Sequence, residues 1–230
     1  MKVHGKILLQ SVAILFGVAA LGQAGRAADI SGLYIGGNGG VARIDYDNAL
    51  YQKEIETAVS GTGSLKFTDA SLRNRNAAWW VDAGYMVSPY IGVEADYLHF
   101  GALYDHVSGR YTSITGLTES VIAATLVRSD GPALGIVLRL PLTESFDIHL
   151  RLADYYGRTT LVNTLNAATN STTRETANSS SLLVALGAAY TFDGHWSAHL
   201  DYLRVNHAGN SSNVVKYDVG LASVGLSYTF

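Results

Sequence analysis

Apolar and polar residues alternate along most of the chain after residue 28, and the last stretch, Val214–Phe230, shows this most clearly. Every second position from 222 to 230 is apolar or aromatic, and the positions between them hold only glycine, serine and threonine. A period of two predicts a β-strand with one apolar face. Because that face ends in aromatic residues, the pattern favours a strand with lipid on one side and a barrel interior on the other. For this strand alone, the edge of a soluble β-sandwich is the alternative.

The same alternation predicts eight strands, joined in turn by short turns and by longer polar segments. The expected strands are Gly32–Asp45, Ala77–Val87, Tyr90–Leu103, Ala133–Leu140, Phe146–Leu161, Ser181–Phe192, His195–Asn206 and Val214–Phe230. The polar segments 46–76, 104–132 and 162–180 are expected to be external loops, with a short helix over Asn48–Ser60 and a hairpin extension at Val121–Val127. Short turns on one side and long loops on the other are typical of outer-membrane barrels.

Three segments that follow short turns repeat one another: Tyr90–Tyr97, Ser145–Leu152 and His195–Tyr202. In each, one face is apolar and the other is small, polar or charged. In a soluble protein the charged face would meet water. In a membrane barrel it is enclosed, so its charges must pair.

Aromatic residues fall into two bands separated by aliphatic residues, as in the interfacial girdles of transmembrane barrels. The band at the turn end comprises Tyr85, Tyr90, Phe146, Tyr190, Phe192, Trp196, Tyr228 and Phe230, and the band at the loop end comprises Trp79, Tyr97, Tyr155, Tyr156 and Tyr202. The sequence therefore predicts an all-β fold, an eight-stranded antiparallel up-and-down transmembrane β-barrel.

The N-terminus has the features of a secretory signal peptide. Two lysines precede the apolar run Ile7–Leu21, and Gly25 and Ala27 supply the small residues at the −3 and −1 positions of a cut after Ala27. Cuts after Ala24 or Ala28 are alternatives. The run is shorter than the ~20 residues of a spanning helix, so an uncleaved anchor is the less favoured alternative. We expect residues 1–27 to be the signal peptide and residues 28–230 to form the barrel domain.

Charge and cysteine content narrow the possible functions. The net charge is −3, and loss of the three cations in residues 1–27 would make it −6. An acidic chain is a poor partner for nucleic acid. The chain has no cysteine, which excludes disulfides and thiol chemistry and suits passage through an oxidising periplasm.

The segments Pro89–Tyr97, Trp196–Tyr202 and Ser227–Phe230 resemble the OmpA-type outer-membrane β-barrel family, without the peptidoglycan-binding domain that often follows the barrel. The resemblance implies export through the periplasm to the cell outer membrane. The implied partners are outer-membrane lipid including lipopolysaccharide, a surface ligand at the external loops, and the outer-membrane assembly machinery. For the last, the terminal aromatic pattern resembles an assembly signal, formed here by Phe230, Tyr228 and Leu226.

Strand parity places nine ionisable residues on the inner face. They are Asp82, Glu94, Asp96, Arg139, Asp147, His149, Arg151, His199 and Asp201. Side chains can fill the interior of an eight-stranded barrel. Two interpretations stay open: a polar core whose charges satisfy one another, which we favour, or a gate that blocks a narrow pore.

Candidate enzymatic residues have unsuitable spacing. Ser197, His199 and Asp201 are the residue types of a catalytic triad, but alternate residues of one strand lie ~7 Å apart. His207 is followed two positions later by Gly209, which supplies no nucleophile. We therefore expect no catalytic, metal or cofactor site and a structural or surface-interaction role. A narrow gated pore for small solutes is the alternative, and a lipid-modifying barrel enzyme is a second one.

Overall fold

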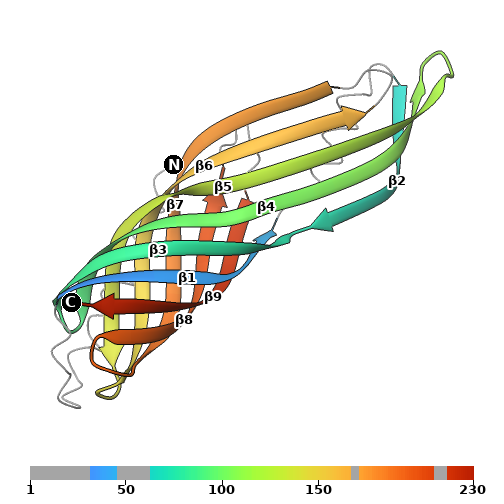
Figure 1. Ribbon diagram of the computed structural model, residues 1–230. Helices are drawn as coiled ribbons and strands as arrows, with labels where there is room; N and C mark the ends of the chain where they lie inside the picture. The colour runs from blue at the N-terminus through green and yellow to red at the C-terminus, as the bar shows by residue number, and fades with distance from the viewer. Residues whose placement is uncertain (1–31, 46–62, 167–170, 210–216) are drawn as a thin grey trace, which may run out of the picture.

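The computed structural model describes residues 32–45, 63–166, 171–209 and 217–230, and nearly all of them form β-strands (Figure 1). The strands are β1 (Gly32–Asp45), β2 (Gly63–Arg73), β3 (Arg75–Ser88), β4 (Ile91–Ser113), β5 (Thr118–Pro141), β6 (Phe146–Asn166), β7 (Ser171–Thr191), β8 (Trp196–Ala208) and β9 (Tyr217–Thr229). Within these residues there is no helix of the length and hydropathy needed to cross a bilayer.

Eight of the strands close into a ring, which confirms the predicted fold class. Neighbouring strands pair in the order β4-β3-β1-β9-β8-β7-β6-β5, and β5 pairs with β4 again. The first and last strands, β1 and β9, pair antiparallel from Tyr34↔Thr229 to Asp45↔Asp218. A closed ring leaves no unpaired strand edge within the hydrocarbon region, where no water is present to satisfy one.

β2 is the outer continuation of β3 rather than a ninth member of the ring. Both pair antiparallel with β4, and they are separated only at Asn74, whose carbonyl oxygen accepts the N–H of Ile44 at 2.9 Å. The prediction that 46–76 is a loop was therefore wrong for residues 63–76. The helix predicted over Asn48–Ser60 lies outside the described residues.

The other two predicted loops are also largely strand. β4 and β5 stay paired up to Thr112↔Thr118, so 104–132 forms a long hairpin, and the predicted extension at Val121–Val127 is confirmed. β6 and β7 stay paired up to Leu165↔Ser171, so most of 162–180 is strand as well. The reason is that these segments lie beyond the lipid. Their outer face meets water, so no apolar alternation is required, and pairing continues from the register already set in the barrel.

A β-bulge on β4 marks where the barrel meets this external sheet. The β4–β5 register shifts between His99 and Ala102, and Gly101 adopts a φ of 75°. A Cβ at Gly101 would also meet the carbonyl oxygen of Ala77 at 2.6 Å, so both conformation and space require glycine. Below the bulge the even-numbered residues of β4 face inward, and above it the odd-numbered residues do. Asp96 and Leu98 face inward below it, and Leu103 and Asp105 face inward above it.

The outer surface of the barrel carries the predicted lipid-facing band. Leu134, Leu186, Leu200 and Val224 are exposed between two groups of exposed aromatic residues. The assignment of Tyr155 to the outer aromatic band was wrong, because Tyr155 is fully buried in the interior. Its neighbour Tyr156 is the outward residue of that pair, since consecutive residues of a strand face opposite ways.

We expect Leu200→Arg to destabilise the folded barrel by about 2–4 kcal/mol in bilayers, because it places a charge in hydrocarbon near the membrane centre. Leu200 is 62% exposed on β8 within the lipid-facing band. Leu117→Arg is the matched control, since Leu117 is similarly exposed (68%) but lies at the tip of the β4–β5 hairpin. Urea unfolding in vesicles measures both. Equal stability of the two variants would show that the facing assigned to β8 is wrong.

Candidate functional site

The nine predicted interior residues lie together in the turn-side half of the barrel. They project inward from β3, β4, β5, β6 and β8, and these five strands together form one enclosed layer of charged side chains. All have nearly buried side chains, Arg139 being the most exposed of those in ion pairs at 15%. The strands place them there because every second position faces inward.

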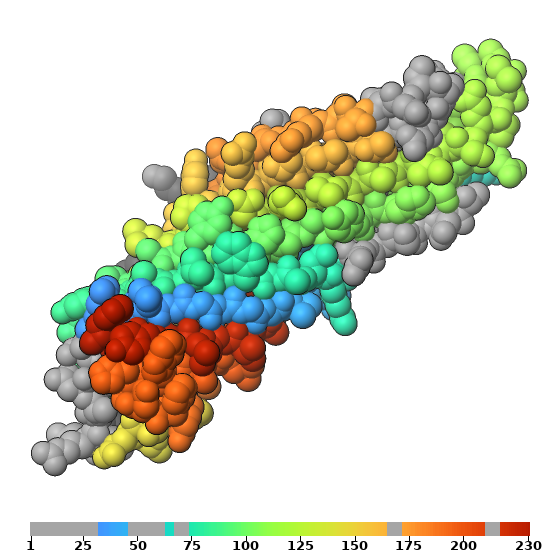
Figure 2. All heavy atoms as spheres, viewed as in Figure 1, coloured from blue at the N-terminus to red at the C-terminus, as the bar shows by residue number. Residues whose placement is uncertain are grey.

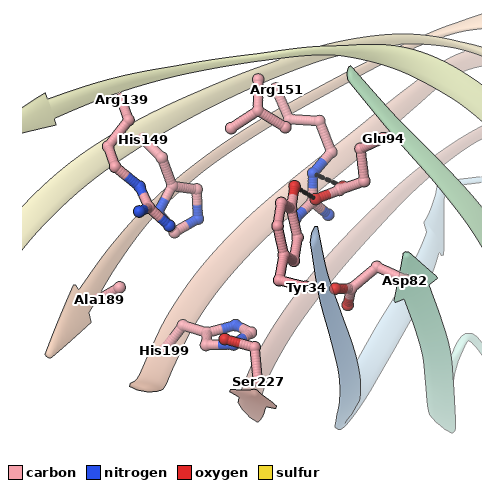
Figure 3. A pocket seen from close by; sticks show the side chains of 10 residues that line it. Tyr34, Asp82, Glu94, Arg139, His149, Arg151, Ala189, His199 and Ser227 are labelled. Carbon is pink, nitrogen blue, oxygen red and sulfur yellow. Dashed lines mark hydrogen bonds and ion pairs between the residues drawn. The ribbon is translucent and has the colours of Figure 1, made fainter. Parts of the chain in front are cut away.

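Arg151 is the centre of the first group. Its Nε is in ion-pair contact with Oε1 of Glu94, and its Nη1 lies 3.8 Å from Oδ1 of Asp96. The Tyr34 hydroxyl donates to the other oxygen of Glu94 at 2.5 Å (Figure 3). The guanidinium carbon also lies 5.8 Å from the ring centroid of Trp80, within cation–π range. One cation from β6 thereby joins acids of β4 to an aromatic of β3.

The second group is organised by two histidines and two aspartates. His149 Nε2 lies 2.7 Å from Oδ1 of Asp201, and His149 Nδ1 lies 3.6 Å from Oδ1 of Asp147. His199 Nδ1 contacts the other oxygen of Asp201 at 3.3 Å, and Arg139 Nε lies 3.5 Å from Asp147. These contacts join β5, β6 and β8 along the inner wall of the barrel.

Two polar partners on β1 were missed from the sequence. Asn38 donates from Nδ2 to Oδ1 of Asp82 at 2.8 Å, and Tyr34 bonds Glu94 as described above. Both face inward by the same alternation that identified the charged residues. Neither carries a formal charge, so neither belongs to the charged set that the sequence singles out, although parity alone places both on the inner face.

Small residues opposite the large ones make room for the network. Gly187 lies directly opposite both His149 on β6 and Asp201 on β8. A Cβ at Gly187 would overlap both of those side chains, and a Cβ at Gly84 would overlap the ring of Tyr34. Alternation of large and small residues around a narrow barrel allows its interior to fill without voids.

The space left between these side chains is small. A cavity of about 30 Å³ is lined by residues of both groups, including Glu94, Arg139 and His199 (Figure 3). It has room for roughly two water molecules. Pockets that bind small molecules occupy ~300–1,000 Å³. Within the described part of the chain, no cluster of three or more histidine, aspartate or glutamate side chains could hold a metal ion.

Above the charged layer, the lumen is filled by apolar side chains, which the sequence reasoning did not predict. Trp80, Leu98, Phe100 and Tyr155 are fully buried there, together with leucines and valines of β7, β8 and β9. The rings of Phe100 and Tyr155 meet edge to face, with centroids 5.4 Å apart. This apolar plug lies between the charged layer and the external sheet.

The serine, histidine and aspartate of β8 do not form a catalytic triad. Ser197 Oγ is hydrogen-bonded to Oγ1 of Thr191 at 2.7 Å, while His199 contacts Asp201. All three are enclosed on the turn side of the apolar plug, away from the external surface. Their contacts are those of an interior polar layer.

A family comparison agrees with this architecture. Residues 28–230 match the sequence family described as the OmpA-like transmembrane domain. The chain belongs to this family. Its relatives include outer membrane protein A of Yersinia pseudotuberculosis serotype I, 25% identical over 170 residues, which cover 74% of this chain and 44% of that protein. Outer membrane protein A of Salmonella typhi is 26% identical over 151 residues, 64% of this chain and 38% of that protein.

This OmpA-like chain thus spans less than half the length of the curated relatives it matches. Among solved structures, it is similar to Ail of Yersinia pestis in complex with the heparin analogue sucrose octasulfate, at 12% identity and a TM-score of 0.43, covering 86% of this chain and 99% of that one. The predicted family and the outer-membrane location are confirmed by the family match and the named relatives. The protein is an integral outer-membrane β-barrel.

Proposed function

We propose that the protein acts at the cell surface as a non-enzymatic interaction protein that presents its external sheet to a ligand. The observation that carries this proposal is the continuation of β4, β5, β6 and β7 far beyond the lipid-facing band (Figure 1). β5 has 24 residues, whereas a tilted spanning strand needs roughly 10. More than half of that strand therefore lies outside the membrane.

The external part is an ordered sheet rather than a set of separate loops. β2, β4, β5, β6 and β7 are continuously paired there, within the segments 46–76, 104–132 and 162–180 that were expected to bind a surface ligand. Paired strands hold side chains in fixed positions, which lowers the entropy lost on binding. At the far tip, Ile114 and Leu117 are 80% and 68% exposed.

A gated pore is the less favoured function, because two layers fill the lumen. A cavity of about 30 Å³ lies among the described side chains of the charged layer, and the apolar plug lies above it. The ion pairs then serve as a polar core that joins strands across the barrel. For the lipid-modifying enzyme, the inward residues of β8 supply no accessible nucleophile.

The C-terminal strand supports a further part of the proposal, namely recognition by the outer-membrane assembly machinery. Leu226 and Phe230 are exposed on the outer surface, and the Tyr228 ring contacts those of Trp196 and Phe230 edge to face. An outward row of apolar and aromatic side chains is accessible to an assembly factor before the barrel closes. Lipopolysaccharide is the expected lipid partner of the outer surface.

Attachment of cells displaying the full chain tests the surface role. We expect these cells to bind bare polystyrene, an apolar surface, several-fold better than cells without the protein. The double variant Ile114→Ser/Leu117→Ser should reduce attachment to the background level, because it removes the apolar tip. Thr115→Ala, at the same tip, is the matched control and should have no effect. Wild-type attachment to bare polystyrene at the background level, or full attachment of the double variant, would contradict the proposal.

A further inference from the structure

The outward-facing residues that border the lipid-facing band differ around the barrel. On β5 the first charged outward residue beyond the band is acidic, Asp130, and on β6 the acidic outward residue Asp154 lies opposite Leu134 of the band. On β8 the first is Arg204, whose Nη2 lies 2.9 Å from Oδ2 of Asp218 and whose Nε donates to Asn206. On β1 and β3 they are two arginines, Arg43 and Arg75, which we call the border arginines.

The border arginines lie directly opposite each other in the β1–β3 register. Residues in such a pair have Cβ atoms about 4.5–5.5 Å apart, and like charges there are destabilising. Arg43 donates from Nε to Oδ1 of Asp45 at 2.9 Å, which leaves its two terminal nitrogens for another acceptor. Arg75 is exposed and has no ion-pair partner among the residues that the structure describes. With Asp45 counted, the three side chains keep a net charge of +1.

The border arginines lie at the height of the lipid headgroups. Val41, two positions before Arg43, is exposed and pairs with Ala77, and Trp79 of the outer aromatic band is four positions after Arg75. Four residues of a strand span about 13 Å along its axis, so both arginines lie on the solvent side of that aromatic band. β1 and β3 run side by side on the face shown in Figure 2. The arginines are therefore next to the outer leaflet.

We propose that Arg43 and Arg75 together bind a phosphate group of a lipid in the outer leaflet. The planar guanidinium fork matches phosphate oxygens and donates two parallel hydrogen bonds to them. A phosphate between two opposed arginines replaces their repulsion with attraction to both. Asp45 holds Arg43 by Nε, which leaves both terminal nitrogens of Arg43 able to donate to the phosphate. The inference needs the outer-membrane location but is independent of the proposed surface ligand.

The test uses the full chain refolded in dodecyl maltoside micelles, which contain no phosphate. Bisphosphorylated lipid A is added, and the unfolding midpoint is followed by heat-dependent gel migration, with retained lipid measured by mass spectrometry. We expect lipid A to raise the midpoint of the wild type and dephosphorylated lipid A to have little effect. The double variant Arg43→Gln/Arg75→Gln should bind lipid A roughly tenfold more weakly, because two charge-assisted contacts are lost.

Arg158→Gln is the matched control and should bind as wild type, since Arg158 is an exposed arginine directly opposite Asp130. Arg75→Glu gives a second, opposite readout. Without lipid A, this variant should have a higher unfolding midpoint than the wild type, because it replaces a like-charge pair with an opposite-charge pair. Addition of lipid A should then cause no further increase in the midpoint. Unchanged binding by the double variant, or an equal loss in Arg158→Gln, would overturn the proposal. Displacement of lipid A by an equal concentration of inorganic phosphate would overturn the assignment to a lipid.

Discussion

Arg151→Ala is expected to lower the free energy of unfolding in bilayers by about 3–5 kcal/mol, the typical cost of removing one partner of a buried ion pair. Arg151 is 3% exposed and contacts Glu94 and Asp96. Its loss leaves two carboxylates in an enclosed layer without their cation. The variant also removes the contact with Trp80, which joins the charged layer to the apolar plug. Urea unfolding in vesicles measures the change.

The matched control for Arg151→Ala is Arg158→Ala on the same strand. Arg158 faces outward and is exposed, so its truncation should change stability by no more than ~0.5 kcal/mol. A double-mutant cycle that combines Arg151→Ala with Glu94→Gln isolates the interaction energy between these two side chains, which we expect to be ~0.5–3 kcal/mol. If Arg151→Ala is as stable as Arg158→Ala, Arg151 does not hold an enclosed network together.

Trp80→Ala should cost about 3–5 kcal/mol of unfolding free energy, the range found when a large aromatic is removed from a packed core. Trp80 is 0% exposed, and its surroundings come from several strands of a closed barrel, so they cannot collapse fully onto the space left behind. The same unfolding assay in vesicles measures the effect.

The adjacent Trp79 provides the control for Trp80→Ala, because it faces lipid and is 46% exposed. Lipid chains can fill the space left by Trp79→Ala, so that variant should lose only about 1 kcal/mol, as an ordinary substitution does. A larger loss for Trp79→Ala than for Trp80→Ala would contradict the apolar plug.

The sequence was sufficient to predict the barrel wherever lipid imposes a pattern on it. Between the two aromatic bands, the outer face must be apolar and the inner face small or polar, so strand facing followed from alternation alone. β1 was predicted with the bounds that the structure shows, Gly32–Asp45. The same alternation places three residues of β6 on its inner face: Asp147, His149 and Arg151.

Beyond the lipid, the same reasoning failed, because the solvent no longer distinguishes the two faces of a strand. Ser171–Ser180 contains serine, threonine and asparagine on both faces, which is typical of a loop, yet it pairs with β6 throughout. The bulge at Gly101 also reverses parity on β4, so Leu103 could not be placed by counting from Glu94. The apolar plug was missed because inward positions were expected to be polar along the whole barrel. Trp80 and Tyr155 show that this holds only for the turn-side half.

Ion conductance of the purified full chain in planar lipid bilayers is the most direct test of the central claim, that the barrel is closed and acts at its surface. Insertion of the folded form is verified by heat-dependent gel migration. The charged layer around Arg151 and the apolar plug around Trp80 predict no stepwise conductance above that of the bare bilayer. Discrete, reproducible conductance steps from the folded protein would contradict the closed lumen and would place the gated pore ahead of the surface-interaction role.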